Sequence, residues 1–313
     1  MEISQLGQTS LFTSRVGFGC GTGAGLMCGD DFDLQKEVVE YAVARGVNFF
    51  DVAPAYGNGR AESNLGKALG DVLRDRNDIV VGTKIALQYD DLTDVLGACE
   101  RELTASLGRL GLNEISILQV HNHVGLETDE DVAEAPGPML GLEHVLGADG
   151  VLDAIETLRK KGLVKSTAFT TFGGQRRAIC EIIDSGRADA MDIELNALSP
   201  GAVYDCSRCL GRYLDCDHET IIERAVGRGM GVFGIRPLGG GSRADRSAGG
   251  SVQSHIDGLV ESGQVATFAE GALRFAMNAP GISSVVLGIR TPGHVESAVA
   301  AAGLGGLPGL RYA

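Results

Sequence analysis

Four polar residues, each placed where a short apolar run ends, are the part of this sequence best equipped for chemistry. They are Asp51, Tyr56, Lys84 and His121. The runs that lead to them, such as residues 79–83 and 115–120, have the length and composition of buried strands. Because the carboxyl ends of parallel strands meet at one face of a sheet, we expect the four side chains to form a single site.

These residue types form a set that can deliver a proton. A tyrosine hydroxyl has an ordinary pKa of about 10, so it needs a cationic neighbour to exchange protons near neutrality. Lys84 can supply that charge and lower the pKa of Tyr56, and Asp51 can pair with Lys84 and hold it. His121 can hydrogen-bond a substrate oxygen and orient a carbonyl group. The set therefore predicts a proton donor beside a site for an electrophile.

No nucleophile accompanies this proton donor in the sequence. The Gly-x-Ser-x-Gly elbow, the His-Glu-x-x-His motif and the Walker loop do not occur, which argues against acyl transfer, zinc proteolysis and phosphoryl transfer. The nucleophile would then come from a cofactor. Hydride from a nicotinamide fits, because the protein would only need to position it and protonate the resulting alkoxide.

The surrounding sequence predicts eight βα units within one domain spanning residues 1–313. Short apolar runs alternate with amphipathic segments that end at glycine, such as Gly46 and Gly111, which is typical of a (β/α)8 TIM barrel. The expected strands are Val16–Gly19, Val47–Asp51, Ile79–Lys84, Ile115–His121, Val164–Thr170, Ala190–Leu195, Gly231–Arg236 and Ser284–Leu287. A short hairpin within Met1–Phe12 should precede the barrel, and extended loops should follow strands four and six.

Composition narrows the classes of partner. With 27 Lys and Arg against 41 Asp and Glu, the net charge of −14 disfavours nucleic acid and anionic lipid. Neither a run of about 20 apolar residues nor a secretion signal is visible, so we expect a cytoplasmic protein without a membrane span. Seven cysteines in a chain of this size favour reduced thiols. Cys206, Cys209 and Cys216 with His218 could suggest zinc, but their spacing favours a loop of free cysteines, so no metal is predicted.

The motifs around the four residues resemble those of the aldo-keto reductases. The matching segments are residues 51–57 (DVAPAYG), 62–69 (ESNLGKAL), 83–84 (TK) and 119–122 (QVHN), and the likeness continues through 236–241 (RPLGGG) to 288–292 (GIRTP). The resemblance implies a catalytic tetrad at Asp51, Tyr56, Lys84 and His121, with Tyr56 as general acid. It also implies the barrel reached above.

The resemblance further implies where a nicotinamide cofactor would bind. Thr170 and Thr171 stand where the family has a Ser-Asn pair, and Asp192 stands where it has a glutamine. Ile235 and then Arg236 stand where relatives place an aromatic residue on the nicotinamide ring. The full set of implied cofactor positions is Gly19, Cys20, Thr170, Thr171, Asp192, Ile235, Arg236, Leu238, Gly240, Gly288, Arg290, Thr291 and His294.

The last unit favours NADP(H) over NAD(H). Thr291 and Pro292 form a plausible helix start, and helix N-termini attract anions. Arg290 and His294 could surround the extra phosphate of NADP.

The sequence thus predicts an NADP(H)-dependent enzyme that interconverts an aldehyde or ketone and its alcohol. The substrate is a small carbonyl or hydroxyl compound. An NAD-dependent dehydrogenase of a sugar or hydroxylated ring, and a nucleotide-sensing barrel with little turnover, stay open as alternatives. Substrate, reaction direction and oligomeric state are not predicted.

Overall fold

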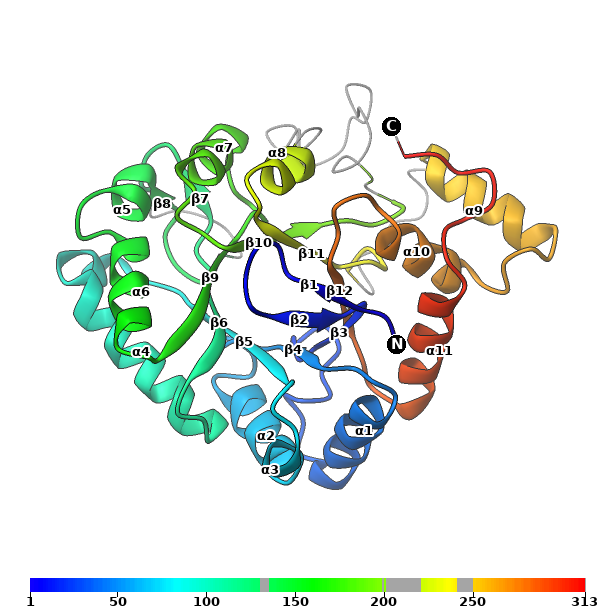
Figure 1. Ribbon diagram of the computed structural model, residues 1–313, viewed down its shortest axis with the longest axis horizontal. Coiled ribbons are helices and arrows are strands. Elements are labelled where there is room, and N and C mark those ends of the chain that lie inside the picture. The colour runs from blue at the N-terminus through cyan, green and yellow to red at the C-terminus, as the bar shows by residue number, and fades with distance from the viewer. Residues whose placement is uncertain (130–134, 199, 201–220, 241–249, 313) are drawn as a thin grey trace.

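Eight parallel strands close into a barrel in the computed structural model, which describes residues 1–313 except 130–134, 199, 201–220, 241–249 and 313 (Figure 1). The strands are β3 (Val16–Gly19), β4 (Phe49–Asp51), β5 (Val80–Ile85), β6 (Ile115–Val120), β9 (Val164–Thr170), β10 (Ala190–Glu194), β11 (Gly231–Ile235) and β12 (Ser284–Gly288). Their order around the ring is β10-β11-β12-β3-β4-β5-β6-β9. The predicted (β/α)8 barrel is confirmed, and the expected strand bounds differ from the observed ones by two residues or less.

The barrel wall is apolar on both sides, because helices cover its outside and side chains fill its inside. Phe49, Phe233 and Ile117 belong to a buried inner cluster to which seven of the strands contribute. Outward-facing residues such as Val81 and Leu118 join the larger cluster beneath the helices. Strands buried on two faces read as continuous apolar runs, which is why they were visible in the sequence.

Helices surround the barrel (Figure 1). They are α1 (Phe32–Ala44), α2 (Arg60–Leu69), α3 (Val72–Asp75), α4 (Val95–Leu110), α5 (Leu142–Leu146), α6 (Val151–Lys160), α7 (Arg176–Ser185), α8 (Ile221–Gly227), α9 (Ser251–Glu261), α10 (Phe268–Met277) and α11 (Pro292–Gly303), with a 3-10 helix, η1 (Tyr89–Thr93), before α4. The helix α4 ends at Gly111, whose φ of 67° is the left-handed conformation that glycine adopts at little cost.

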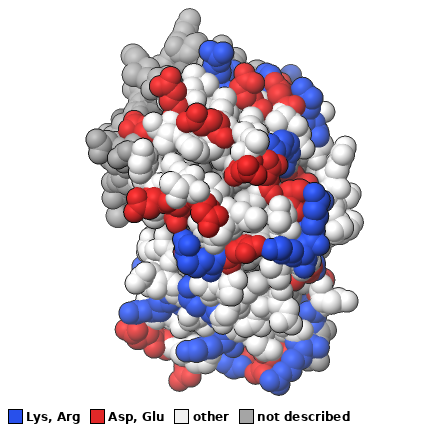
Figure 2. Space-filling model, turned by 90° about the vertical axis from the view of Figure 1, so that its left-hand side faces the viewer, with Lys and Arg blue, Asp and Glu red and all other residues white. Residues whose placement is uncertain are grey.

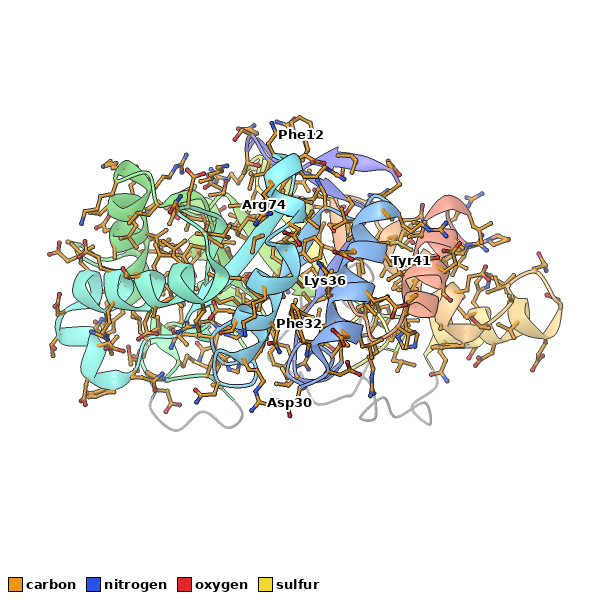
Figure 3. The ribbon with its side chains drawn as sticks, turned by 90° about the horizontal axis from the view of Figure 1, so that it is seen from below. Phe12, Asp30, Phe32, Lys36, Tyr41 and Arg74 are labelled. Atoms are coloured by element: carbon orange, nitrogen blue, oxygen red, sulfur yellow. The ribbon has the colours of Figure 1, made fainter. Side chains whose placement is uncertain are left out.

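The predicted N-terminal hairpin is present. Its strands β1 (Ile3–Gln5) and β2 (Phe12–Ser14) pair antiparallel, so the second strand continues two residues past the expected end. Leu6 and Leu11, in the turn, are buried against the inner cluster and close that end of the barrel. Figure 3 shows the hairpin residue Phe12 at one end of the molecule and Asp30, in the loop after β3, at the other.

The first and last barrel strands join at a seam. Strand β12 pairs with β3, with Val285 opposite Val16. Beside this pairing, Ser284 Oγ donates a hydrogen bond of 2.7 Å to the Ser14 carbonyl, and Arg15 donates one of 2.8 Å to the Ile282 carbonyl. Hydrogen bonds between residues about 270 positions apart therefore complete the ring.

The loops after the fourth and sixth barrel strands, β6 and β10, are the long ones predicted. After β6, the small strands β7 (Val124–Gly125) and β8 (Leu140–Gly141) pair, which is more regular structure than the loop expected from the sequence. Most of the connection after β10 lies outside the described residues. The residues considered there for zinc, Cys206, Cys209, Cys216 and His218, therefore also lie outside them.

Acidic and basic side chains are interspersed on the face in Figure 2, which is the left-hand side of Figure 1, where α4 and α6 lie. Ion pairs there include Lys161 with Glu100, which joins the end of α6 to α4. No helix in the described parts of the chain is long and apolar enough to cross a membrane.

Candidate active site

The strand register brings two of the four polar residues, Asp51 and Lys84, together. Asp51 is the last residue of β4, and Lys84 lies near the end of the neighbouring strand β5. The Lys84 ammonium donates hydrogen bonds to Asp51 Oδ1 at 2.6 Å and to the Val52 carbonyl at 3.0 Å. Both side chains are almost completely buried, so solvent screens this ion pair little.

Tyr56 and His121 join this pair from two loops. Tyr56 follows β4, and Nζ of Lys84 lies 5.0 Å from the centroid of its ring. His121 follows β6, and its ring meets that of Tyr56 edge to face, with centroids 5.9 Å apart. Both rings are partly exposed. The structure therefore brings the four residues together at the carboxyl ends of the strands, with Tyr56 and His121 accessible.

The pKa of Tyr56 differs from the expectation that Lys84 would lower it. Burial raises this pKa above the ordinary value, and the Lys84 ammonium offsets only part of the rise, while Asp51 and Asp192 add to it. Burial by itself would also lower the pKa of Lys84, but the Asp51 carboxylate raises it, and the net pKa lies above the ordinary value. At neutral pH the site therefore holds a protonated phenol beside an ammonium group.

His121 is neutral in this environment. Burial, and to a smaller extent the positive charge of Lys84, lowers its pKa to about 3. A neutral imidazole has one N–H donor and one acceptor nitrogen. It can therefore donate a hydrogen bond to a substrate oxygen without adding a charge.

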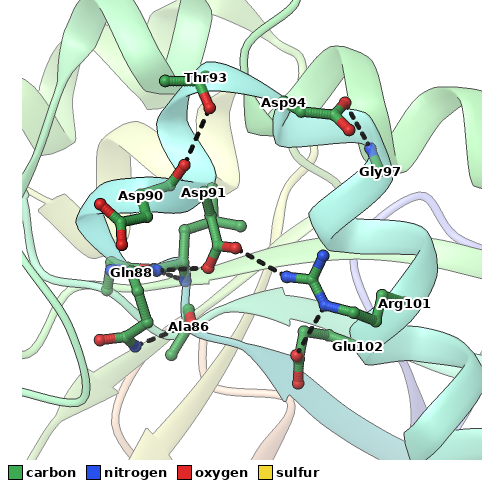
Figure 4. Close-up of polar contacts among 11 residues, drawn as sticks. Ala86, Gln88, Asp90, Asp91, Thr93, Asp94, Gly97, Arg101 and Glu102 are labelled. Atoms are coloured by element: carbon green, nitrogen blue, oxygen red, sulfur yellow. Dashed lines mark hydrogen bonds and ion pairs between the residues drawn. The ribbon is translucent and has the colours of Figure 1, made fainter.

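The loop after β5 is fixed by a cluster of hydrogen bonds at the same end of the barrel. Asp91 accepts a hydrogen bond of 2.8 Å from the Gln88 N–H and another of 2.7 Å from Arg101 (Figure 4). Asn122, next to His121, donates to the carbonyls of Leu87 and Pro138, both at 2.9 Å. These contacts tie the loops after β5 and β6 to each other and set the position of His121.

The loop after β3 approaches the site from the opposite side. The Cys20 N–H donates a hydrogen bond of 2.9 Å to the Asp51 carbonyl. Burial raises the pKa of the Cys20 thiol well above its ordinary value, so Cys20 packs as a neutral side chain. Gly19 pairs with Asp51 on one side and Gly288 on the other, and a Cβ at Gly19 would lie 3.0 Å from Val286.

A second buried polar cluster surrounds Asp192 on β10. Its Oδ1 accepts hydrogen bonds from Thr170 Oγ1 at 2.8 Å and from the Thr171 N–H at 3.1 Å, and its Oδ2 accepts one from Gln119 Nε2 at 2.7 Å. Thr171 Oγ1 is buried and has no hydrogen-bond partner among the residues that the structure describes. A buried hydroxyl without a partner is costly, which suits a position completed by a ligand.

Arg236 follows β11 in a conformation that is unfavourable for a side chain other than glycine. Its φ is 53°, and its guanidinium lies 3.9 Å from the centroid of the Phe172 ring. Ile235 is half-buried beside the inner cluster, and Leu238 packs on the outer one. Gly240, at φ 87°, has no atom of the described residues within 4 Å of where a Cβ would lie.

The last unit begins its helix as predicted. Thr291 is the N-cap of α11, its side chain accepts a hydrogen bond of 3.2 Å from the His294 N–H, and Pro292 occupies the first turn. The side chains of Arg290, Thr291 and His294 are all exposed. Gly288 lies so close to Ala24 that a Cβ on Gly288 would be 2.9 Å from the Ala24 side chain. The predicted cofactor residues thus line one end of the barrel from β3 round to α11.

The model of the Aldo/keto reductase family matches residues 15–307, which is almost the whole chain. The chain belongs to the aldo/keto reductase family.

Individual known proteins resemble the chain to different extents. L-galactose dehydrogenase of Arabidopsis thaliana is 25% identical over 318 residues, which cover 96% of this chain and 88% of that protein. A probable voltage-gated potassium channel subunit beta of Arabidopsis thaliana is 33% identical, but over only 39% of this chain and 37% of its own length. The structure of an aldo-keto reductase from Klebsiella pneumoniae in complex with NADPH superimposes with a TM-score of 0.68 at 16% identity, covering 97% of this chain and 92% of that one.

Several residues that the sequence argument left without a role shape this family member's site. Gln119 holds Asp192 from the neighbouring part of the barrel. Glu62 on α2 is fully buried, accepting hydrogen bonds of 2.6 Å from both Thr83, next to Lys84, and Arg109. Two signals for Glu62 were available, its position on the apolar face of an amphipathic helix and its place in the family-like segment 62–69, but its partners are distant in the sequence.

His123 is a further residue near the site to which the sequence assigned no role. Its Nδ1 is buried without a hydrogen-bond partner, and its ring meets Phe172 edge to face at 5.7 Å. Gly173 lies directly beside the ring, because a Cβ there would be 2.3 Å from His123 Cε1. Burial and the positive charge of Arg236 lower the pKa of His123. In a continued strand, His121 and His123 would lie on the same face because they are two residues apart, but β6 ends at Val120, so strand geometry does not set the direction of His123.

An open groove of about 890 Å³ lies elsewhere, between α2, α3 and α4 on the outside of the barrel. Its lining includes Gly66, Lys67, Arg74 and Arg109, and none of the four central residues. We assign the active site by the buried ion pair and its neighbours rather than by this groove. Among the residues that the structure describes, no group of three or more His, Cys, Asp or Glu side chains is arranged to hold a metal ion.

Proposed function

We propose that this chain is an NADP(H)-dependent oxidoreductase that interconverts an aldehyde or ketone and its alcohol. The observation that carries the proposal is the Tyr56 hydroxyl-bearing ring beside the buried Lys84–Asp51 ion pair and the neutral His121. Membership of the aldo/keto reductase family supports it.

In the proposed reaction the protein's own residues orient the carbonyl group and move a proton. A bound nicotinamide supplies the hydride. The His121 imidazole donates a hydrogen bond to the carbonyl oxygen, and Tyr56 Oη transfers its proton to that oxygen as negative charge develops. The Lys84 ammonium then stabilises the phenolate until it regains a proton from solvent.

The raised pKa of Tyr56 favours the reductive direction. A phenol whose pKa lies above its ordinary value keeps its proton at neutral pH, which is the form that a general acid requires. The oxidative direction needs the phenolate as base. We therefore expect reduction to be faster at neutral pH and oxidation to increase at alkaline pH.

The residues at the mouth fit a nicotinamide nucleotide. The unpartnered hydroxyl of Thr171 and the fixed hydroxyl of Thr170 offer groups for an amide. At the start of α11, Arg290, Thr291 and His294 offer charge and N–H donors for the phosphate that distinguishes NADP from NAD. The fold shared with a reductase solved with NADPH supports the same choice.

A second candidate is an NAD-dependent dehydrogenase of a sugar or hydroxylated ring. The relative L-galactose dehydrogenase, aligned over 96% of this chain, favours it. Comparing oxidation of an aldose panel with NAD⁺ and NADP⁺ separates this candidate from the first. A nucleotide-sensing barrel, the third alternative, predicts tight NADPH binding with negligible turnover on any substrate.

The further parts of the proposal are a single domain spanning residues 1–313, a cytoplasmic location and a small-molecule substrate. The single domain is supported by an eight-stranded ring whose first and last strands are paired.

The test is NADPH consumption with a panel of aldehydes and ketones by wild type, Tyr56→Phe and Tyr41→Phe. Tyr41 lies on α1, where its exposed hydroxyl donates to Glu296, so it is the matched control. We expect Tyr56→Phe to lose about 10²–10⁴-fold in turnover while still binding NADPH, and Tyr41→Phe to resemble wild type. Unchanged turnover in Tyr56→Phe would overturn the assignment.

A further inference from the structure

Asp192 is a carboxylate buried inside the barrel, and none of the hydrogen-bond donors that reach it from the described part of the chain is a cation. Its side chain is 3% exposed. Its three hydrogen-bond donors, the Thr170 hydroxyl, the Thr171 N–H and the Gln119 amide, are all neutral. A buried carboxylate in neutral surroundings is costly, and a cation placed nearby would stabilise it.

The charge of Asp192 reaches the reacting end of the site. It adds to the rise in the pKa of Tyr56 and also acts on Lys84, so the carboxylate lies within electrostatic range of both. Its other charged neighbour is Asp51, and on the β11 side it stands opposite the apolar Phe233. Burial raises the pKa of Asp192 to about 6, although Thr170, Gln119 and Lys84 oppose the rise. The group is therefore mostly ionised at neutral pH and loses its charge under mildly acidic conditions.

A nicotinamide ring differs in charge between its two states, because the oxidised ring is a cation and the reduced ring is neutral. The ring must lie next to the carbon whose oxygen receives the Tyr56 proton. Asp192 lies beside that place, because it accepts a hydrogen bond from the N–H of Thr171, whose buried hydroxyl is one of the groups proposed to meet the nicotinamide amide. A buried negative charge there acts on the two states of the cofactor differently.

We propose that Asp192, held by Thr170, Thr171 and Gln119, is a positioning residue whose carboxylate selectively stabilises the oxidised, cationic form of the bound nicotinamide. The inference rests on the proposed function. A neutral amide at this position, which the resemblance implies for other family members, would lack this effect. The consequence for this chain is that the bound reduced cofactor becomes a stronger hydride donor, and that protonating Asp192 removes the bias.

The test measures the dissociation constants of NADP⁺ and NADPH by calorimetric titration in wild type and Asp192→Asn. Asparagine preserves shape, since its oxygen can accept from Thr170 and Thr171 and the Gln119 amide can reverse to accept from its NH₂ group. We expect the ratio of the NADP⁺ constant to the NADPH constant to rise on the order of tenfold in Asp192→Asn at about pH 8. Taking the ratio cancels contributions common to both nucleotides, including the extra phosphate.

The pH dependence of this ratio is a second readout that a merely structural role would not change. In wild type the ratio should rise by a similar factor as the pH falls from about 8 to about 5, and in Asp192→Asn it should stay flat. Thr170→Val removes one donor to the carboxylate, so it should move the wild-type midpoint to higher pH. These measurements need no turnover.

Ser284→Ala is the control for the loss of a buried hydrogen bond, because Ser284 bonds the Ser14 carbonyl in the seam between β12 and β3. It should keep the wild-type ratio and pH dependence. A wild-type ratio that does not change with pH, or equal ratios in wild type and Asp192→Asn, would overturn the inference while both nucleotides still bind. Failure of wild type to bind either nucleotide would instead overturn the proposed function. If Asp192→Asn does not fold, the wild-type pH series alone decides.

Discussion

The Lys84 ammonium lies 2.6 Å from Asp51 Oδ1, and the two side chains are 3% and 9% exposed. Each charge is thereby compensated in a place that water hardly reaches. Removing one partner of such a pair leaves the other charge buried alone, which costs far more than losing an exposed ion pair.

We therefore expect Asp51→Asn and Lys84→Met each to lower the free energy of unfolding by about 3–5 kcal/mol. The double variant should lose less than the sum of the two, because neither charge is left alone. Urea unfolding of the four proteins measures this. The exposed pair between Lys165 and Glu114, 2.9 Å apart, is the control, and Lys165→Met should cost about 1 kcal/mol or less. Equal losses for Asp51→Asn and Lys165→Met would contradict the prediction.

The neutral His121 predicts a specific dependence of stability on pH. Its pKa is about 3 in the folded protein and about 6.5 when unfolded, so the unfolded state binds the extra proton first as the pH falls. The contribution of His121 is thus fully present above the unfolded pKa and decreases below it. Between about pH 7.5 and about pH 5, wild type should lose about 2 kcal/mol more than His121→Asn.

Denaturant unfolding of both proteins at the two pH values tests this. Asp192 changes the free energy of unfolding in the opposite direction, because its raised pKa makes the folded state bind the proton first. Since both proteins contain Asp192, its contribution cancels in the comparison. Parallel losses in the two proteins would show that His121 is not held neutral.

The contact between Gly173 and His123 predicts an intolerant glycine. A Cβ at Gly173, whose φ is 70°, would lie 2.3 Å from the His123 ring. A Cβ at Gly162, whose φ is 76°, would have no atom of the described residues within 4 Å. Both Gly→Ala changes carry the backbone strain of a positive φ, roughly 1 kcal/mol, but only Gly173→Ala adds overpacking of about 1–3 kcal/mol. Thermal unfolding compares them. Equal destabilisation would mean that the ring moves aside freely.

Arg290 should distinguish the two nicotinamide cofactors. We expect Arg290→Ala to weaken NADPH binding about tenfold and to leave NADH binding nearly unchanged, because only NADPH carries the extra phosphate. Fluorescence titration measures both. Arg228→Ala, which removes an exposed partner of Asp184, is the matched control and should change neither. A similar loss for both nucleotides would place Arg290 away from that phosphate.

Local sequence patterns were sufficient to predict the barrel and the proximity of Asp51, Tyr56, Lys84 and His121. Strands buried on both faces gave continuous apolar runs, and Thr291 followed by Pro292 indicated where α11 begins. The polar residues stood at strand ends, where the fold fixes their position independently of side-chain detail.

Long-range contacts were not predictable in the same way. Gln119 and Asp192 are hydrogen-bonded although they are 73 positions apart in the sequence, and Glu62 and Arg109 although they are 47 apart. No local sequence pattern predicts either pair. The direction in which the pKa of Tyr56 shifts also depends on the balance between burial and the charge of Lys84. That balance cannot be read from the residue types alone. The small pairing of β7 with β8 lies within a Pro-containing loop, where turn residues obscured it.

The seam between β12 and β3 bears on how the molecule is made. Strand β3 is synthesised before the other strands of the barrel, yet one of its two neighbours, β12, is the last of them to be made. Until then its backbone donors and acceptors on that side have no permanent partner, and the inner apolar cluster is open along one edge. The partly synthesised barrel therefore passes through a state with an exposed strand edge, and that edge is covered only once β12 has been made.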